Sequence, residues 1–380
     1  MRDDPGMHNA LCEQLGIDVP IFAFSHCRDV VAAVTKAGGM GVLGAVAHSP
    51  KGLEIDLAWI DNEVGDLPYG VDLLLPVKFN DDGAKRTEPT DAKDLFPPAH
   101  TAFINGMLEQ YDVPALPPDL AARGGRMSVS PEAAGTLLDV ALTHPIRLFA
   151  SALGPPPEDF IRKAHEQGAV VAALAGTAAH ARRHKDAGVD LIVAQGTEAG
   201  GHTGTVSTLV LVPEVVQAVA PTPVLAAGGI VKGSQIAAAM ALGAAGVWCG
   251  SVWLTTEEAE THPAVKQKML TASSSDTVRS RSLTGKPARM LRTPWTDAWE
   301  AEGAPAPLGM PLQTMLVAEA QQRIGRSAHN EGTGANDLAT YFVGQGVGLM
   351  DRIRPTRQVV EEMVQEYLQV AEMFAAQVAD

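Results

Sequence analysis

The chain has 380 residues, enough for one large α/β barrel with additions or for two or three ordinary domains. It carries 29 basic and 44 acidic residues, a formal charge of -15, so we expect neither nucleic acid nor a membrane surface as a partner. No apolar run approaches the roughly 20 residues that span a bilayer, and the N-terminus does not resemble a signal peptide, which predicts a cytoplasmic protein.

Eight short apolar runs alternate with helix-like segments of about 10 to 15 residues. Most runs are apolar throughout, as is typical of parallel strands covered by helices on both faces. Glycine recurs where a helix must end before the next strand, as in KAGGMGV and EQGAVV. The expected strands are residues 19–24, 40–46, 70–77, 146–151, 169–174, 189–194, 223–227 and 246–250.

Eight repeats of this unit favour a closed (β/α)8 TIM barrel, with an open doubly wound sheet as the alternative. Residues 80–131, rich in Pro, Gly and charge, predict an insertion after the third strand. Residues 257–346 show little strand character and predict a smaller helical cap, which serves as a substrate domain. The barrel then comprises residues 8–256 and 347–380, and its eighth helix comes from the C-terminal segment.

Cysteine usage predicts neither a disulfide framework nor a structural metal site. Cys12, Cys27 and Cys249 are few and scattered, and no CxxC or HExxH spacing occurs.

The loops after the last two expected strands are rich in glycine, and barrel chemistry lies on such loops. AAGGI places Gly228 and Gly229 after the seventh strand, and CGS places Gly250 and Ser251 after the eighth. Backbone N–H groups can approach a phosphate where no Cβ intervenes, and a helix N-terminus adds a favourable dipole. We expect a phosphate site here; the alternative is that the glycines only turn tight corners.

The sixth expected strand leads into GTEAGGHTG at residues 196–204. Gly200 and Gly201 would let the backbone lie against a flat ligand, and His202 would project into the barrel mouth. The alternative is a histidine that only caps a turn.

Together these motifs resemble the nitronate monooxygenase (2-nitropropane dioxygenase) family of FMN-dependent barrels, and they are similar to flavin-dependent enoyl-acyl-carrier-protein reductases. The resemblance rests on GTEAGGHTG, AAGGI and GVWCGS, and extends to KAGGMGVLGA, TGKPARMLR and YFVGQGVGLM. It covers most of the chain and implies FMN as the cofactor.

The resemblance also implies roles for individual residues. His202 stands where the family keeps its catalytic base, and Gln195 and Gly200 would lie along the isoalloxazine ring. Asp72 occupies a position where relatives usually have an Asn in contact with the flavin, and Phe24 belongs to FAFSH, which replaces their usual Pro-Met. The FMN phosphate would be held by Gly229, Trp248, Cys249, Gly250 and Ser251, and Gly201 and Gly228 complete the expected cofactor site.

Three further groups have two interpretations each. Ser25 and His26 follow the first strand and could face the flavin or satisfy a turn. The basic segment 279–292 could bind a pyrophosphate of a nicotinamide cofactor or coenzyme A, or it could be a solvated face or form salt bridges to the barrel. His180 and His184 have a metal-binding spacing, but their basic surroundings favour a solvent-facing helix.

The leading hypothesis is an FMN-dependent oxidoreductase that oxidises alkyl nitronates or nitroalkanes with O2. His202 would act as the base or, as imidazolium, stabilise the anionic nitro group. A second hypothesis is an FMN enzyme that uses NAD(P)H to reduce an enoyl thioester or quinone. The third is a phosphate-binding barrel without flavin. The sequence leaves open whether the protein is a homodimer.

Overall fold

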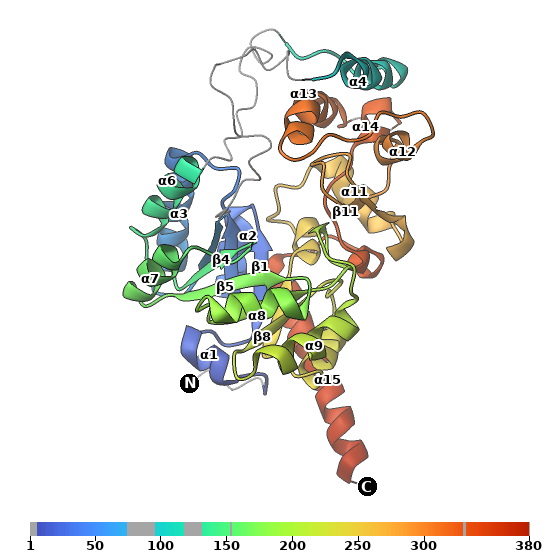
Figure 1. Ribbon diagram of the computed structural model, residues 1–380. Coiled ribbons are helices and arrows are strands. Elements are labelled where there is room, and N and C mark those ends of the chain that lie inside the picture. The colour runs from blue at the N-terminus through green and yellow to red at the C-terminus, as the bar shows by residue number, and fades with distance from the viewer. Residues whose placement is uncertain (1–5, 74–95, 118–130, 153, 330–331, 380) are drawn as a thin grey trace.

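A computed structural model describes residues 6–73, 96–117, 131–152, 154–329 and 332–379. Eight parallel strands form a closed barrel in the order β1-β2-β3-β4-β5-β6-β8-β9 (Figure 1). The barrel is confirmed and the open sheet is wrong; residues 74–77 of the third expected strand lie outside the described residues. The strands are β1 (Ile21–Ser25), β2 (Met40–Gly44), β3 (Gly70–Leu73), β4 (Leu148–Ser151), β5 (Val170–Ala175), β6 (Leu191–Gln195), β8 (Val224–Ala227) and β9 (Gly246–Cys249).

Helices surround the barrel, and the short helix α1 (Ala10–Leu15) closes its N-terminal end. Leu11 and Leu15 of α1 are buried against the side chains that fill the barrel interior. The first seven surrounding helices are α2 (Arg28–Lys36), α3 (Pro50–Val64), α6 (Pro131–Ala141), α7 (Glu158–Glu166), α8 (Ala178–Asp186), α9 (Thr208–Val219) and α10 (Gly233–Ala241).

Helix α15 (Thr356–Ala379) packs against α10 and α2, which is the place of an eighth barrel helix. The α10–α15 contact is close, since a Cβ at Gly233 would lie 2.0 Å from the carbonyl oxygen of Met363. The Glu258 carboxylate accepts hydrogen bonds from Thr356 N at 2.8 and 3.1 Å. It thereby gives a partner to a backbone N–H at the start of α15 that has none within the helix. The last turns of α15 extend beyond the barrel (Figure 1).

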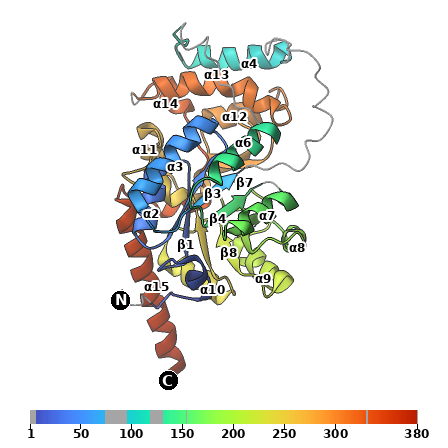
Figure 2. The same ribbon diagram turned by 90° about the vertical axis from the view of Figure 1, so that its left-hand side faces the viewer.

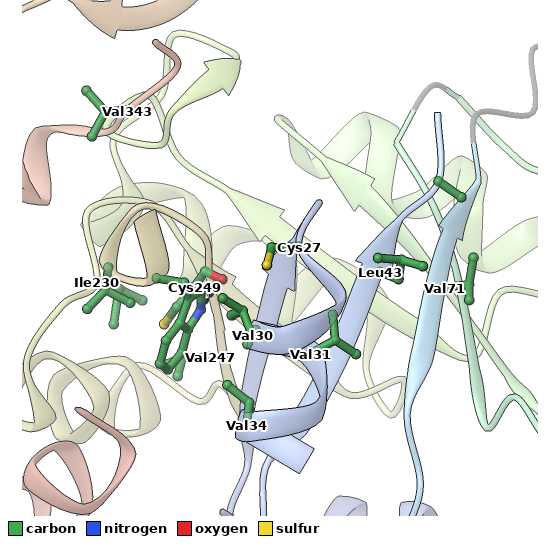
Figure 3. Close-up of a cluster of buried hydrophobic side chains, with 14 of the residues drawn as sticks. Cys27, Val30, Val31, Val34, Leu43, Val71, Ile230, Val247, Cys249 and Val343 are labelled. Atoms are coloured by element: carbon green, nitrogen blue, oxygen red, sulfur yellow. Dashed lines mark hydrogen bonds between the residues drawn. The ribbon is translucent and has the colours of Figure 1, made fainter. Parts of the chain in front are cut away.

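Successive strand residues alternate between the interior and an outer layer that faces the helices. Figure 3 shows part of this outer layer, where Leu43 and Val71 face outward and Val247 and Cys249 lie near Val30 of α2. The interior layer includes Phe22, Val42, Ala150, Val193 and Trp248.

The cap lies at the end of the barrel opposite α1 (Figures 1 and 2). Residues 257–346 have little strand character, as expected, but they contain two short strands, β10 (Thr277–Ser280) and β11 (Ala288–Leu291), which pair antiparallel. Strand β11 also pairs with β7 (Gly201–His202), so the sheet is completed by residues far away in the sequence. The cap helices are η2 (Ser251–Thr255), α11 (Pro263–Thr271), η3 (Ser274–Asp276), α12 (Pro294–Glu300), α13 (Leu312–Ser327), α14 (Gly334–Leu338) and η4 (Gln345–Leu349).

Part of the expected insertion packs on the cap. Helix α4 (Pro98–Gln110) places Phe103 edge-on to Trp299 of α12, with ring centroids 4.9 Å apart. Arg323 of α13 donates hydrogen bonds to the carbonyl oxygens of Val113 and Pro114 at 2.7 and 2.8 Å. The remainder of the predicted insertion, residues 80–95 and 118–130, lies outside the described residues. Within the described part of the chain, no helix has the length and apolarity needed to cross a membrane.

Candidate active site

An aromatic pair lies inside the barrel near the C-terminal ends of the strands. Phe24 and Trp248 stack with ring centroids 6.2 Å apart and an interplanar angle of 25°. Trp248 also stacks on Phe22, one layer deeper, at 6.3 Å. The Trp248 ring forms part of an apolar surface inside the mouth, and the phosphate contact expected of Trp248 and the residues that follow it stays a prediction. Gln195, the last residue of β6, faces the same interior by the alternation along its strand.

The two glycines of GTEAGGHTG have different structural reasons. A Cβ at Gly200 would lie 2.9 Å from Gly344 N, so its missing side chain allows another segment of this chain to approach. Gly201 has φ +74° and open space where a Cβ would be. The sequence interpretation, in which both glycines make room for a flat ligand, fits the surroundings of Gly201 but not those of Gly200.

The segment that approaches Gly200 belongs to the YFVGQGVGLM motif, which had no assigned role. Gly344 N donates to Ser251 Oγ at 2.8 Å, and Gln345 N donates to Glu198 O at 2.8 Å. A Cβ at Gly346 would lie 2.8 Å from the carbonyl oxygen of Gly229. The segment thus joins the loops that follow β6, β8 and β9, and its glycine spacing was the only signal of this role.

The expected phosphate loops contain unusual backbone and open space. Gly228 and Gly229 have φ +125° and +68°, conformations that favour glycine. A Cβ at Gly250 would meet no atom within 4 Å. Ser251 is the first residue of the short helix η2, directly after β9.

The Cys249 side chain points away from the mouth. It is 1% exposed, in the outer layer of Figure 3, and burial raises its pKa to about 12. Its carbonyl oxygen accepts a hydrogen bond from Trp253 Nε1 at 2.8 Å. The prediction that Cys249 binds the cofactor finds no support from its side chain.

Arginines of the basic segment 279–292 hold the loop that carries the histidine. Arg279 donates to the carbonyl oxygen of Thr203 at 3.1 Å, and buried Arg289 donates to that of Thr197 at 2.8 Å. These contacts favour the structural interpretation of the segment over a pyrophosphate site.

Glu198, within the same loop, caps the helix that follows it. Its carboxylate accepts from Thr208 N at 2.9 and 3.1 Å and from Thr208 Oγ1 at 2.8 Å at the start of α9. The sequence interpretation assigned no role to Glu198.

His202 lies on β7 opposite Ala288 of β11 and is an exposed residue. Its Nε2 is 2.9 Å from Thr284 Oγ1, and its ring centroid is 6.4 Å from that of Phe342. Desolvation by the surrounding protein, together with the charge of Lys286, lowers its pKa. The imidazole is therefore neutral, and able to accept a proton, over a wider pH range than a free histidine.

Ser25 and His26 occupy a turn beside the interior. Ser25 Oγ accepts from Cys27 N at 3.1 Å, which is a turn contact. His26 Nδ1 donates to the carbonyl oxygen of Gly44 at 2.8 Å, and its ring meets Phe24 edge-on at 5.1 Å. His26 thus lies beside the aromatic pair, whereas Ser25 serves the backbone.

His180 and His184 lie on α8 and have different surroundings. His180 is exposed, but His184 is 2% exposed and donates from Nε2 to the carbonyl oxygen of Leu174 at 3.1 Å. The expectation of a wholly solvent-facing helix is therefore wrong for His184, which ties α8 to β5.

Asp72 is the buried carboxyl group of the mouth. It is 7% exposed, lies next to the end of β3, and has outward-facing neighbours in Val71 and Leu73. Its own side chain therefore faces the interior. Burial raises its pKa to about 7.

These features fit a flat aromatic cofactor with a phosphate. The mouth combines the Phe24–Trp248 surface, the polar side chains of Gln195 and Asp72, and loops in which Gly201 and Gly250 leave open space. Pockets for such ligands are mostly apolar with a few placed polar groups.

Comparisons with known proteins agree with this geometry. A family model described as nitronate monooxygenase matches residues 17–366. The chain is 61% identical to a Mycobacterium tuberculosis H37Rv protein named as a monooxygenase, Rv1533. The match spans 363 residues, which are 95% of this chain and 97% of that protein. The structure of nitroalkane oxidase from Streptomyces ansochromogenes is 26% identical, with a TM-score of 0.78 over 96% of this chain and 100% of that chain.

FabK from Thermotoga maritima is also similar, at 29% identity and a TM-score of 0.72 over 97% of this chain and 99% of that chain. The family match spans nearly the whole chain, from before β1 into α15. This protein therefore belongs to the nitronate monooxygenase family of flavin-dependent oxidoreductases.

Proposed function

We propose that the protein is an FMN-dependent enzyme that oxidises alkyl nitronates or nitroalkanes with O2, with His202 as the base. The observation that carries this proposal is His202 itself, a neutral histidine on β7 at the barrel mouth with one ring nitrogen already bound. The nitroalkane oxidase neighbour supports the substrate class. Three free thiols are typical of a reducing compartment, and we place the enzyme in the cytoplasm.

In this proposal the contact with Thr284 sets which nitrogen of His202 carries the proton. Thr284 Oγ1 donates to the carbonyl oxygen of Lys286 at 3.1 Å and accepts from Lys286 N at 3.3 Å. In this proposal the Thr284 hydroxyl hydrogen goes to the Lys286 carbonyl, and Oγ1 accepts from His202 Nε2 at 2.9 Å. Nδ1 is then the unprotonated nitrogen, and we assign it the removal of the α-proton from a neutral nitroalkane.

The chain's own residues bind and orient the cofactor in this proposal. When bound, FMN would take electrons from the substrate and deliver them to O2. The Phe24–Trp248 surface would contact its ring, and the loops at Gly228, Gly229 and Gly250 would hold its phosphate through backbone N–H groups. The cap, residues 257–346, would cover the substrate.

The substitution His202→Asn tests the base. Asparagine keeps some hydrogen bonding but has no titratable nitrogen. We expect FMN to stay bound, turnover of neutral nitroalkanes to fall roughly 100-fold or more, and turnover of preformed nitronates to fall much less. Equal losses for both substrates would indicate charge stabilisation instead of proton removal. Unchanged turnover of both would mean that His202 has only a structural role in its turn.

A second candidate is an NAD(P)H-dependent reductase of an enoyl thioester or quinone, which the similarity to FabK favours. Anaerobic mixing separates the two candidates through the flavin absorbance at about 450 nm. Bleaching by a nitronate but not by NAD(P)H supports the oxidase, and the reverse supports the reductase. A colourless purified protein that binds no added FMN would contradict both.

A further inference from the structure

Asp72 is buried without a polar partner from the adjacent strands. Its neighbour in register on β2 is Gly44, which has no side chain, and its neighbour on β4 is Ala150, which has only a methyl group. Among the described residues, the Asp72 carboxyl group forms no hydrogen bond or ion pair, although it is only 7% exposed. Its oxygens are not among the fully buried side-chain atoms without a hydrogen bond, so they keep a small exposure through which a ligand could supply the missing partner.

Within the part of the chain that the structure describes, no positive charge acts to keep Asp72 ionised. His26, the residue after β1, has its ring over Gly44, since a Cβ there would lie 2.7 Å from Nδ1 and Cε1. Burial lowers the pKa of His26 and outweighs the hydrogen bond to Gly44, which raises it; the neighbouring His48 lowers it further, so the neutral ring is favoured. Burial alone accounts for the raised pKa of Asp72.

We propose that Asp72 is a neutral carboxylic acid that donates a hydrogen bond to an acceptor atom of the bound flavin ring, so that cofactor affinity depends on this proton. The inference rests on the proposed FMN function. Its geometric basis is the position of the side chain, inside the barrel, beside the end of β3 and in the same mouth as Phe24 and Trp248. A ligand in the mouth would give the carboxyl group the partner that the chain does not.

The sign of the pH effect follows from linkage. If the ring accepts the Asp72 proton, FMN prefers the protonated form and raises the carboxyl pKa further when it binds. The affinity for FMN is then highest at low pH. It declines as the pH rises above about 7, which is the pKa of Asp72 in the protein without cofactor. The decline is up to tenfold per pH unit until the pKa of the complex is reached.

The test measures FMN binding to cofactor-free protein by quenching of flavin fluorescence between about pH 5.5 and 9. We expect the wild-type Kd to rise at least tenfold over this range. Asp72→Asn keeps an N–H donor without a titratable proton, so its Kd should stay flat. Asp72→Leu, which has no donor, should bind weakly at every pH. Asp351→Asn, a change at an exposed carboxylate beside Arg352, should behave as wild type.

A second readout is infrared absorption of the protonated carboxyl, whose band should be present in the wild-type complex at pH 6 and absent in Asp72→Asn. Parallel pH profiles for wild type and Asp72→Asn, or a missing band, would overturn the inference about Asp72. Absence of FMN binding by wild type at every pH would instead contradict the proposed function. Circular dichroism confirms that each variant is folded.

Discussion

Replacing Gly200 with alanine should destabilise the protein even when no cofactor is bound. The added Cβ would lie 2.9 Å from Gly344 N, well inside the optimal separation of about 3.5 to 4.0 Å. The approaching segment is held, because Gly344 N donates to Ser251 Oγ and Gln345 N donates to Glu198 O, both at 2.8 Å. No rotamer change can relieve an overlap between backbones, so we expect a loss of about 2 to 3 kcal/mol in the free energy of unfolding.

Gly201→Ala is the matched control one residue along. Its Cβ meets no atom within 4 Å, so the cost is that of the left-handed backbone at φ +74°, about 1 kcal/mol. Urea unfolding of both cofactor-free variants, followed by tryptophan fluorescence, measures the difference. If Gly200→Ala unfolds as wild type but no longer binds FMN, Gly200 faces the ligand and the packing argument is wrong.

Three further predictions concern the histidine, the buried acid and the last helix. Thr284→Val removes the acceptor of His202 Nε2 and should lower kcat/KM for neutral nitroalkanes roughly tenfold, with Thr284→Ser restoring it; equal rates for Val and Ser would contradict the tautomer assignment. Because the folded pKa of Asp72 is raised to about 7, its protonated form favours folding and this advantage is lost as pH rises from about 4 to 7. Asp72→Asn should therefore gain up to about 4 kcal/mol over wild type at pH 8 and much less at pH 5, measured by urea unfolding; a constant difference would refute this. Truncation after residue 345 removes α15 and exposes the faces of α10 and α2, so soluble expression should collapse; a soluble, yellow product would show that the barrel closes without it.

The barrel and much of its mouth could be predicted from local sequence. Eight apolar runs separated by helical segments predict parallel strands, because a strand that is covered on both faces must be apolar throughout. The loops that follow these strands meet at one end of a barrel, so Gly228, Gly229, Gly250 and His202 could be expected near one another. The burial of Asp72 follows from the same pattern, since it is a single carboxylate within an apolar run.

Contacts between distant parts of the chain decided the rest. The partners of Gly200 and His202, at Gly344 and Thr284, are more than 80 residues away in the sequence, and no local pattern specifies them. The sequence of β11 does not show the pattern of a strand. Its strand conformation depends on pairing with β10 and with the two residues of β7. Trp248 and Cys249 are both apolar, so only barrel closure determined which side chain enters the interior and which packs against the helices.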